Sequence, residues 1–181
     1  MNDNTVSSNK GQEAEQQETV KVVLADDDKD DQEIFEDALN EASIPAELKT
    51  VDNGQELLDH LKDPSEPNPD IIFLDINMPV KSGKEVLAEI KADETLKDIP
   101  TVVISTSDHP RDIEDTFKAG ANLFVRKPFS FSSLIIMLKK IFMLKWAGEL
   151  FKPLRKTFFM SEKNISERGD IETHPWLCRQ A

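Results

Sequence analysis

The chain has 181 residues, of which 38% are apolar and 31% charged, a balance typical of one soluble domain with tails. A net charge of −13 disfavours binding to nucleic acid unless the fold presents a local basic face. The lone Cys178 excludes an intramolecular disulfide, the polar N-terminus lacks an export signal, and the apolar run 134–144 is too short to span a membrane, so we expect a cytoplasmic protein.

Five short apolar runs in the middle of the chain predict β-strands. The third and fourth, Ile-Ile-Phe-Leu and Thr-Val-Val-Ile, show no polar alternation, which is typical of strands buried on both faces of a parallel sheet. The second run mixes apolar and charged residues and is the weakest. The predicted strands are 20–25, 47–51, 71–74, 101–104 and 122–125.

Each predicted strand is followed by apolar residues at helical spacing. Ile34, Phe35, Ala38 and Leu39 give this pattern in the first helix. Asn53 with Gly54 predicts a turn before the second helix, and Ser82 with Gly83 opens the third helix. The predicted helices are 30–42, a helix through 57–61, one through 86–90, one through 113–119, and a long one from 130 to about 151.

Five successive strand–helix units predict an α/β fold, with a doubly wound parallel sheet and helices on both faces. Residues 1–19 are rich in Asn, Gln, Glu and Ser, and this composition favours a disordered tail. We therefore divide the chain into an N-terminal tail (1–19), a core domain (20–145) and a C-terminal extension or tail (146–181).

Polar residues follow the strands at the edge where a parallel sheet binds its ligands. Asp26 and Asp27 follow the first strand, Asp75 the third, Ser105 the fourth and Lys127 the fifth. Neighbouring carboxylates repel one another unless a cation joins them, and oxygen ligands select a hard metal such as Mg²⁺. With a lysine to neutralise phosphoryl oxygens and a carboxylate to attack phosphorus, this group of residues suits phosphoryl transfer.

Four motifs at these strand ends resemble the receiver domain of two-component response regulators. The likeness covers about residues 20–145 and implies a flavodoxin-like, five-stranded (βα)5 receiver fold with strand order 2-1-3-4-5. The motifs are Ala-Asp-Asp-Asp at 25–28, Phe-Leu-Asp-Ile-Asn-Met-Pro at 73–79 followed by Gly83, Ile-Ser-Thr-Ser at 104–107, and Val-Arg-Lys-Pro-Phe at 125–129.

The resemblance assigns the phosphoacceptor and the metal ligands. Asp75 matches the aspartate that accepts the phosphoryl group. Asp26 and Asp27 match the acid pair that, together with Asp75, binds Mg²⁺. The backbone carbonyl of Asn77 is expected to be a further metal ligand.

The resemblance also assigns the residues that respond to the phosphoryl group. Ser105 matches the hydroxyl that turns toward it, and Lys127 matches the invariant lysine. Phe124 falls where a switching aromatic residue, often a tyrosine, usually lies; a core role for it is equally open. Pro128 follows the lysine, often after a cis bond in this family.

Several other polar residues have plainer interpretations. Asp28, Asp30 and Asp31 are possible metal ligands, but a helix cap and a solvated first turn explain them better. Asp70 is expected to start a strand rather than join the site. His109, before Pro110, is expected at the surface. An inactive receiver-like domain is an alternative, but such domains usually lose a key residue, and none is lost here.

The C-terminal part of the core offers a surface for partners. Residues 129–159 are rich in lysine and arginine, and the last helix carries more apolar side chains than one packing face needs. We expect a partner protein or a second copy to cover the excess; the alternative is that the C-terminal segment folds back over it. The stretch 146–159 resembles the extension of receiver-only regulators associated with bacterial phytochromes, which implies a homodimer.

The expected function is therefore a receiver-only relay rather than an enzyme. Asp75 would take a phosphoryl group from a sensor histidine kinase or phosphotransfer protein, and a switched surface would bind a downstream protein. A phosphatase of the haloacid dehalogenase type is the alternative from another class. That family needs an aspartate two residues after the nucleophile, where this chain has Asn77. A constitutive scaffold that is never phosphorylated is a third possibility.

Overall fold

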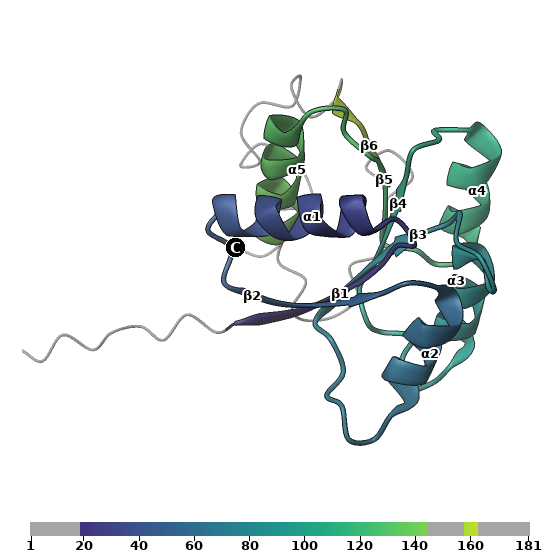
Figure 1. Cartoon of the computed structure of the whole chain (residues 1–181). Coiled ribbons are helices and arrows are strands. Elements are labelled where there is room, and N and C mark those ends of the chain that lie inside the picture. Colours follow the sequence, from purple (N-terminus) through teal and green to yellow (C-terminus); the bar gives the residue numbers. More distant parts are fainter. Residues whose placement is uncertain (1–18, 145–157, 163–181) are drawn as a thin grey trace, which may run out of the picture.

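The computed structural model describes residues 19–144 and 158–162. It is a single six-stranded parallel sheet, with strand order β2-β1-β3-β4-β5-β6 and helices on both faces (Figure 1). The elements in chain order are β1 (Val20–Ala25), α1 (Lys29–Glu41), β2 (Ala46–Val51), α2 (Gly54–Lys62), β3 (Ile71–Asp75), α3 (Gly83–Ala92), β4 (Thr101–Ser105), α4 (Pro110–Lys118), β5 (Leu123–Arg126), α5 (Phe131–Met143) and β6 (Phe159–Met160).

The central strands alternate between two hydrophobic cores. Residues such as Ile72 and Leu74 face the core beneath α2, α3 and α4, whereas Ile71 and Phe73 face the core beneath α1 and α5. Because both faces are covered, all five residues of β3 and all five of β4 are buried. This explains why the sequence of these strands shows no polar alternation.

Local sequence signals set where the helices begin. The Asp28 side chain accepts bonds from the backbone N–H groups of Asp30 and Asp31 at the start of α1. At the start of α3, Ser82 and Glu85 form a reciprocal capping box. These caps fix the two helices directly after β1 and β3, at the sheet edge where the polar residues gather.

The predicted α/β fold and its order of strands 2-1-3-4-5 are confirmed, but the last helix is shorter than expected. Helix α5 ends at Met143, whereas the apolar pattern predicted about 151. Leu144 adopts an extended conformation (ψ 117°) while its N–H bonds to the Ile141 carbonyl, and its side chain is buried. The chain therefore turns to bury Leu144 instead of continuing the helix. The rest of the predicted helix, from residue 145 to about 151, lies outside the described residues.

The sheet also has a sixth strand that the sequence did not predict. Strand β6 pairs in parallel with β5, in the part of the chain that we assigned to a C-terminal extension or tail. It consists of two residues, too few to show any periodicity, and it is held by the burial of the preceding Phe158, which is 1% exposed. Across the described helices, none is long and apolar enough to cross a membrane.

Gly83 lies so close to the end of β3 that a side chain would collide with it. A Cβ at this position would stand 2.1 Å from the carbonyl oxygen of Asp75 and 2.8 Å from the Cα of Ile76. Since both are backbone atoms, we expect Gly83→Ala to lower the free energy of unfolding by ~1–3 kcal/mol, measured by urea denaturation.

The control is Ala88→Gly at an exposed position of the same helix. This substitution lowers helix propensity without creating a steric contact, and it should lower the free energy of unfolding by about 1 kcal/mol. Helix propensity alone would make Gly83→Ala stabilising, so a gain in stability would contradict the close contact.

Candidate functional site

The carboxyl ends of β1 and β3 place two carboxylates inside the protein. Asp26 follows β1 directly, and its backbone N–H bonds to the Val51 carbonyl at the end of β2. Asp75 is the last residue of β3, and its Oδ1 accepts a 2.8 Å bond from the backbone N–H of Asn77. The side chains of Asp26 and Asp75 are only 3% and 8% exposed, so they need partners to be stable.

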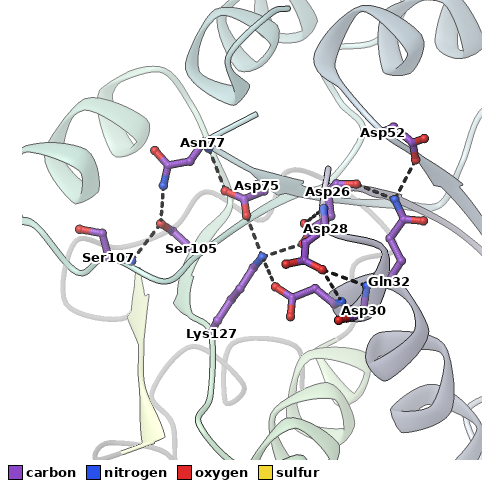
Figure 2. Close-up of polar contacts among 11 residues, drawn as sticks. Asp26, Asp28, Asp30, Gln32, Asp52, Asp75, Asn77, Ser105, Ser107 and Lys127 are labelled. Atoms are coloured by element: carbon purple, nitrogen blue, oxygen red, sulfur yellow. Dashed lines mark hydrogen bonds and ion pairs between the residues drawn. The ribbon is translucent and has the colours of Figure 1, made fainter. Parts of the chain in front are cut away.

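Their shared partner is Lys127, which follows β5. Its Nζ lies 2.7 Å from the Oδ2 atoms of Asp26 and Asp75 (Figure 2). It lies at the same distance from Asp31 Oδ2. The backbone N–H of Lys127 donates a 2.7 Å bond to the carbonyl of Ser105 at the end of β4. One ammonium group thus joins residues from β1, α1 and β3, and its backbone is tied to β4.

Burial and charge act in opposite directions on this cluster. Burial raises the pKa of Asp26, because desolvation penalises the carboxylate more than its bond from Lys127 favours it. Burial by itself would lower the pKa of Lys127, but the carboxylates of Asp75, Asp26 and Asp31 outweigh this effect and hold that pKa above its ordinary value. Lys127 therefore stays charged. Keeping the buried Asp26 ionised in the folded protein costs free energy.

A row of hydroxyl and amide groups extends from Asp75 along the same sheet edge. The side-chain N–H of Asn77 lies 3.5 Å from Ser105 Oγ, which also accepts a 3.2 Å bond from the backbone N–H of Ser107. Ser105 is fully buried. Its hydroxyl is thus placed beside the loop that follows Asp75, as the sequence predicted (Figure 2).

Two residues of the cluster were missed at the sequence level. We had assigned Asp31 to a solvated first turn, yet it contacts Lys127. Gln32 is buried, and its Nε2 donates to the Asp26 carbonyl at 2.6 Å and to Asp52 Oδ1 at 2.9 Å, which fixes the loop after β1. Their only sequence signal is their place one turn into the helix that follows the acid pair.

The cluster has the chemistry that a divalent cation needs. Three carboxylates face one ammonium, so negative charge is left over, and all the acidic donors are oxygens. Asp27 lies exposed beside Asp26. Within the described ranges, no three acidic, histidine or cysteine side chains are arranged around a common metal position. Lys127 lies between Asp26 and Asp75. The metal ligands Asp26, Asp27, Asp75 and the Asn77 carbonyl therefore stay a prediction.

The remaining candidate residues lie around this cluster. Phe124 is fully buried in the core. Asp70 bonds to the backbone of Lys21 at the opposite end of the strands, and His109 caps α4 from an exposed position. The bond between Lys127 and Pro128 is trans, since no cis peptide occurs in the described parts of the chain, and the cis bond suggested by the resemblance is absent.

Comparison with known proteins agrees with this arrangement. The family model described as the response regulator receiver domain matches residues 22–139. The response regulator Rcp1 of Synechocystis sp. is 33% identical over 124 residues, which cover 66% of this chain and 84% of that protein.

Solved structures of similar proteins share the fold. The phosphorylated cyanobacterial phytochrome response regulator RcpA is 38% identical, with a TM-score of 0.66, covering 72% of this chain and 98% of the other. The Mn²⁺-bound form of response regulator Rcp1 is 30% identical, with a TM-score of 0.64, covering 72% and 96%.

The raised pKa of Asp26 predicts a pH-dependent effect of removing its charge. The folded chain holds the Asp26 proton more tightly than the unfolded chain does, so the ionised carboxylate costs stability at neutral pH. Asp26→Asn should therefore raise the free energy of unfolding at pH 7. The gain should disappear as the pH falls through the folded-state pKa toward the ordinary value of 3.8, where both states are protonated.

Urea denaturation across this pH range measures the effect, with Asp59→Asn on an exposed position of α2 as the matched control. If Asp26→Asn instead lowered the free energy of unfolding at pH 7, the bond between Asp26 and Lys127 would outweigh the burial of the carboxylate. That result would contradict a raised pKa of Asp26.

Proposed function

The chain belongs to the family of response regulator receiver domains, and from this premise we propose that it accepts a phosphoryl group on Asp75 from a phosphohistidine. The donor is a sensor histidine kinase or a phosphotransfer protein, and the phosphorylated form presents a changed surface to a downstream protein. The single observation that carries the proposal is the contact of Lys127 Nζ with the carboxylates of both Asp26 and Asp75.

These residues suit the transfer step. A carboxylate oxygen of Asp75 attacks phosphorus in line as the bond to the histidine nitrogen breaks, and the histidine takes up a proton. Lys127 is close enough to neutralise phosphoryl oxygens, and the Ser105 hydroxyl lies along the same edge. Mg²⁺ held by Asp26, Asp27, Asp75 and the Asn77 carbonyl would supply further charge stabilisation when bound.

The alternative of a small-molecule phosphatase has less support. A second acid two residues after the nucleophile would protonate the leaving group, but Asn77 stands there and directs its amide toward Ser105. We therefore propose a signalling role without turnover of a separate substrate.

The homodimer and the cytoplasmic location expected from the sequence belong to the same proposal. Helix α5 exposes the apolar side chains of Ile136 and Met143, which could contact a second copy of the chain.

An apolar cleft beside the cluster is suited to a protein donor. It has a volume of about 300 Å³ and lies between α1 and the loop that joins β5 to α5. Lys127 and Asp31 line it together with the exposed apolar side chains of Ile34, Phe129 and Phe131. Exposed apolar side chains around a reactive group indicate a docking surface, so we propose that the histidine-bearing protein binds here.

The first test uses a donor that needs no docking surface. Incubated with acetyl phosphate and Mg²⁺, the chain should gain one phosphoryl group, seen as a single added mass by intact mass spectrometry. The adduct should be absent from Asp75→Asn, which lacks the nucleophile, and from a sample treated with a chelator. Asp59→Asn is the control and should be labelled like the wild type. Labelling of Asp75→Asn to the same extent would contradict the assignment.

The second test separates docking from chemistry. Ile34→Glu places a charge in the apolar cleft while leaving Asp75 and Lys127 intact. Transfer from an autophosphorylated phytochrome-type histidine kinase should slow by about tenfold or more, a loss of roughly 1.4 kcal/mol, whereas labelling by acetyl phosphate should be unchanged. Ala88→Glu, at an exposed position of α3, is the control for the added charge. Equal slowing with both donors would place the effect in the chemistry and refute docking at Ile34.

A further inference from the structure

The C-terminal segment 158–162 is bound to the sheet edge much as a separate peptide would be. The backbone N–H of Phe124 donates a 2.7 Å bond to the Phe158 carbonyl, and β6 continues this pairing along β5. The Phe158 ring lies between Phe117 of α4, at a centroid distance of 5.0 Å, and Phe124 of β5, at 6.5 Å. The segment therefore covers both the open edge of β5 and an apolar surface beside it.

The same segment also holds the loop that carries Lys127. Glu162 Oε1 accepts bonds from the backbone N–H groups of Phe129 (2.9 Å) and Ser130 (3.2 Å), where α5 begins. A carboxylate at the N-terminus of a 13-residue helix is favoured by the helix dipole. Phe129 is further held by Arg126, whose guanidinium lies 4.9 Å from its ring centre.

The short stretch 127–130 thus has two anchors. Its first residue is held by the carboxylates of Asp26, Asp31 and Asp75, and its last two by Glu162. Phosphorylation would move negative charge from the Asp75 carboxylate outward to the phosphoryl oxygens, and the Lys127 ammonium would follow that charge. Since Lys127 and Phe129 are two residues apart, such a movement would strain the bonds to Glu162.

We propose that the segment 158–162 is an internal latch, which covers the edge of β5 in the unphosphorylated chain and is released when Asp75 is phosphorylated. Release uncovers the N–H and C=O groups of β5 together with Phe117 and Phe124, a surface that fits an extended apolar segment of a partner protein. This inference rests on the proposed function, since it needs a phosphoryl group at Asp75. Coupling of this kind is reciprocal: whatever weakens the latch must favour the phosphorylated arrangement by the same factor.

The test uses beryllium fluoride with Mg²⁺, which stands in for the phosphoryl group on an aspartate, and the full chain. Glu162→Ala removes the bonds to Phe129 and Ser130, and it should bind the mimic about fivefold or more tightly than the wild type in a fluorine NMR titration. Phe158→Ala should act in the same direction. Glu47→Ala, which removes a charge from an exposed position on β2, should leave the affinity unchanged.

Amide hydrogen exchange supplies the second measurement. In the wild type, the mimic should speed exchange at the N–H groups of Phe124, Phe129 and Ser130, each of which donates a bond to the segment. If Phe158→Ala fails to fold, Glu162→Ala still decides the matter, because it leaves the apolar packing in place.

The outcomes separate the two proposals. If the wild type binds the mimic but Glu162→Ala binds it no more tightly, the latch is refuted while the proposed function stands. If the wild type does not bind the mimic at all, the proposed function fails and the latch fails with it. Protection of Phe124 that depends on protein concentration would mean that a second copy supplies the strand, and this would overturn an internal latch.

Discussion

The ammonium group of Lys127 is the interaction on which the rest of the site depends. It lies 2.7 Å from carboxylates that come from β1, α1 and β3, and it reaches them from the end of β5. Without it, the buried Asp26 and Asp75 would face each other unpaired, and removing one partner of a buried ion pair typically costs about 3–5 kcal/mol. The lysine therefore holds together an arrangement of acids that the fold alone would separate.

This charge balance also supports the proposed switching role of the site. The cluster has more negative than positive charge, so it favours an added cation, and a new anionic group there would compete with the three carboxylates for the lysine. The strands beneath are fully buried and close-packed, and they resist small displacements. The adjustment is then left to the segments beyond the strand ends, above all the stretch 127–130.

The sequence predicted those parts of the site that the topology of a parallel sheet dictates. The sequence was enough to predict that Asp26, Asp75 and Lys127 lie close together. Each was expected to follow a strand, and the carboxyl ends of parallel strands meet at one edge of the sheet. Asp31 was missed, since a capped, solvated helix turn explains an acid there equally well. Strand β6 was missed because its position depends on contacts of Phe158 with Phe117 and Phe124, which no local pattern encodes.

The two edges of the sheet differ in a way that gives the sixth strand its importance. Strand β2 alternates exposed charged residues, Glu47 and Lys49, with half-buried ones, and such charges protect an edge from pairing with other chains. Strand β5 is apolar and buried along Leu123–Val125, so its edge needs a cover. That cover is a strand of only two residues held by Phe158 and Glu162, whereas the neighbouring pairs β3–β4 and β4–β5 each match four residues. Because local opening begins where the fewest contacts must break, β6 is the part of the sheet that a change at Lys127 could displace for the least free energy.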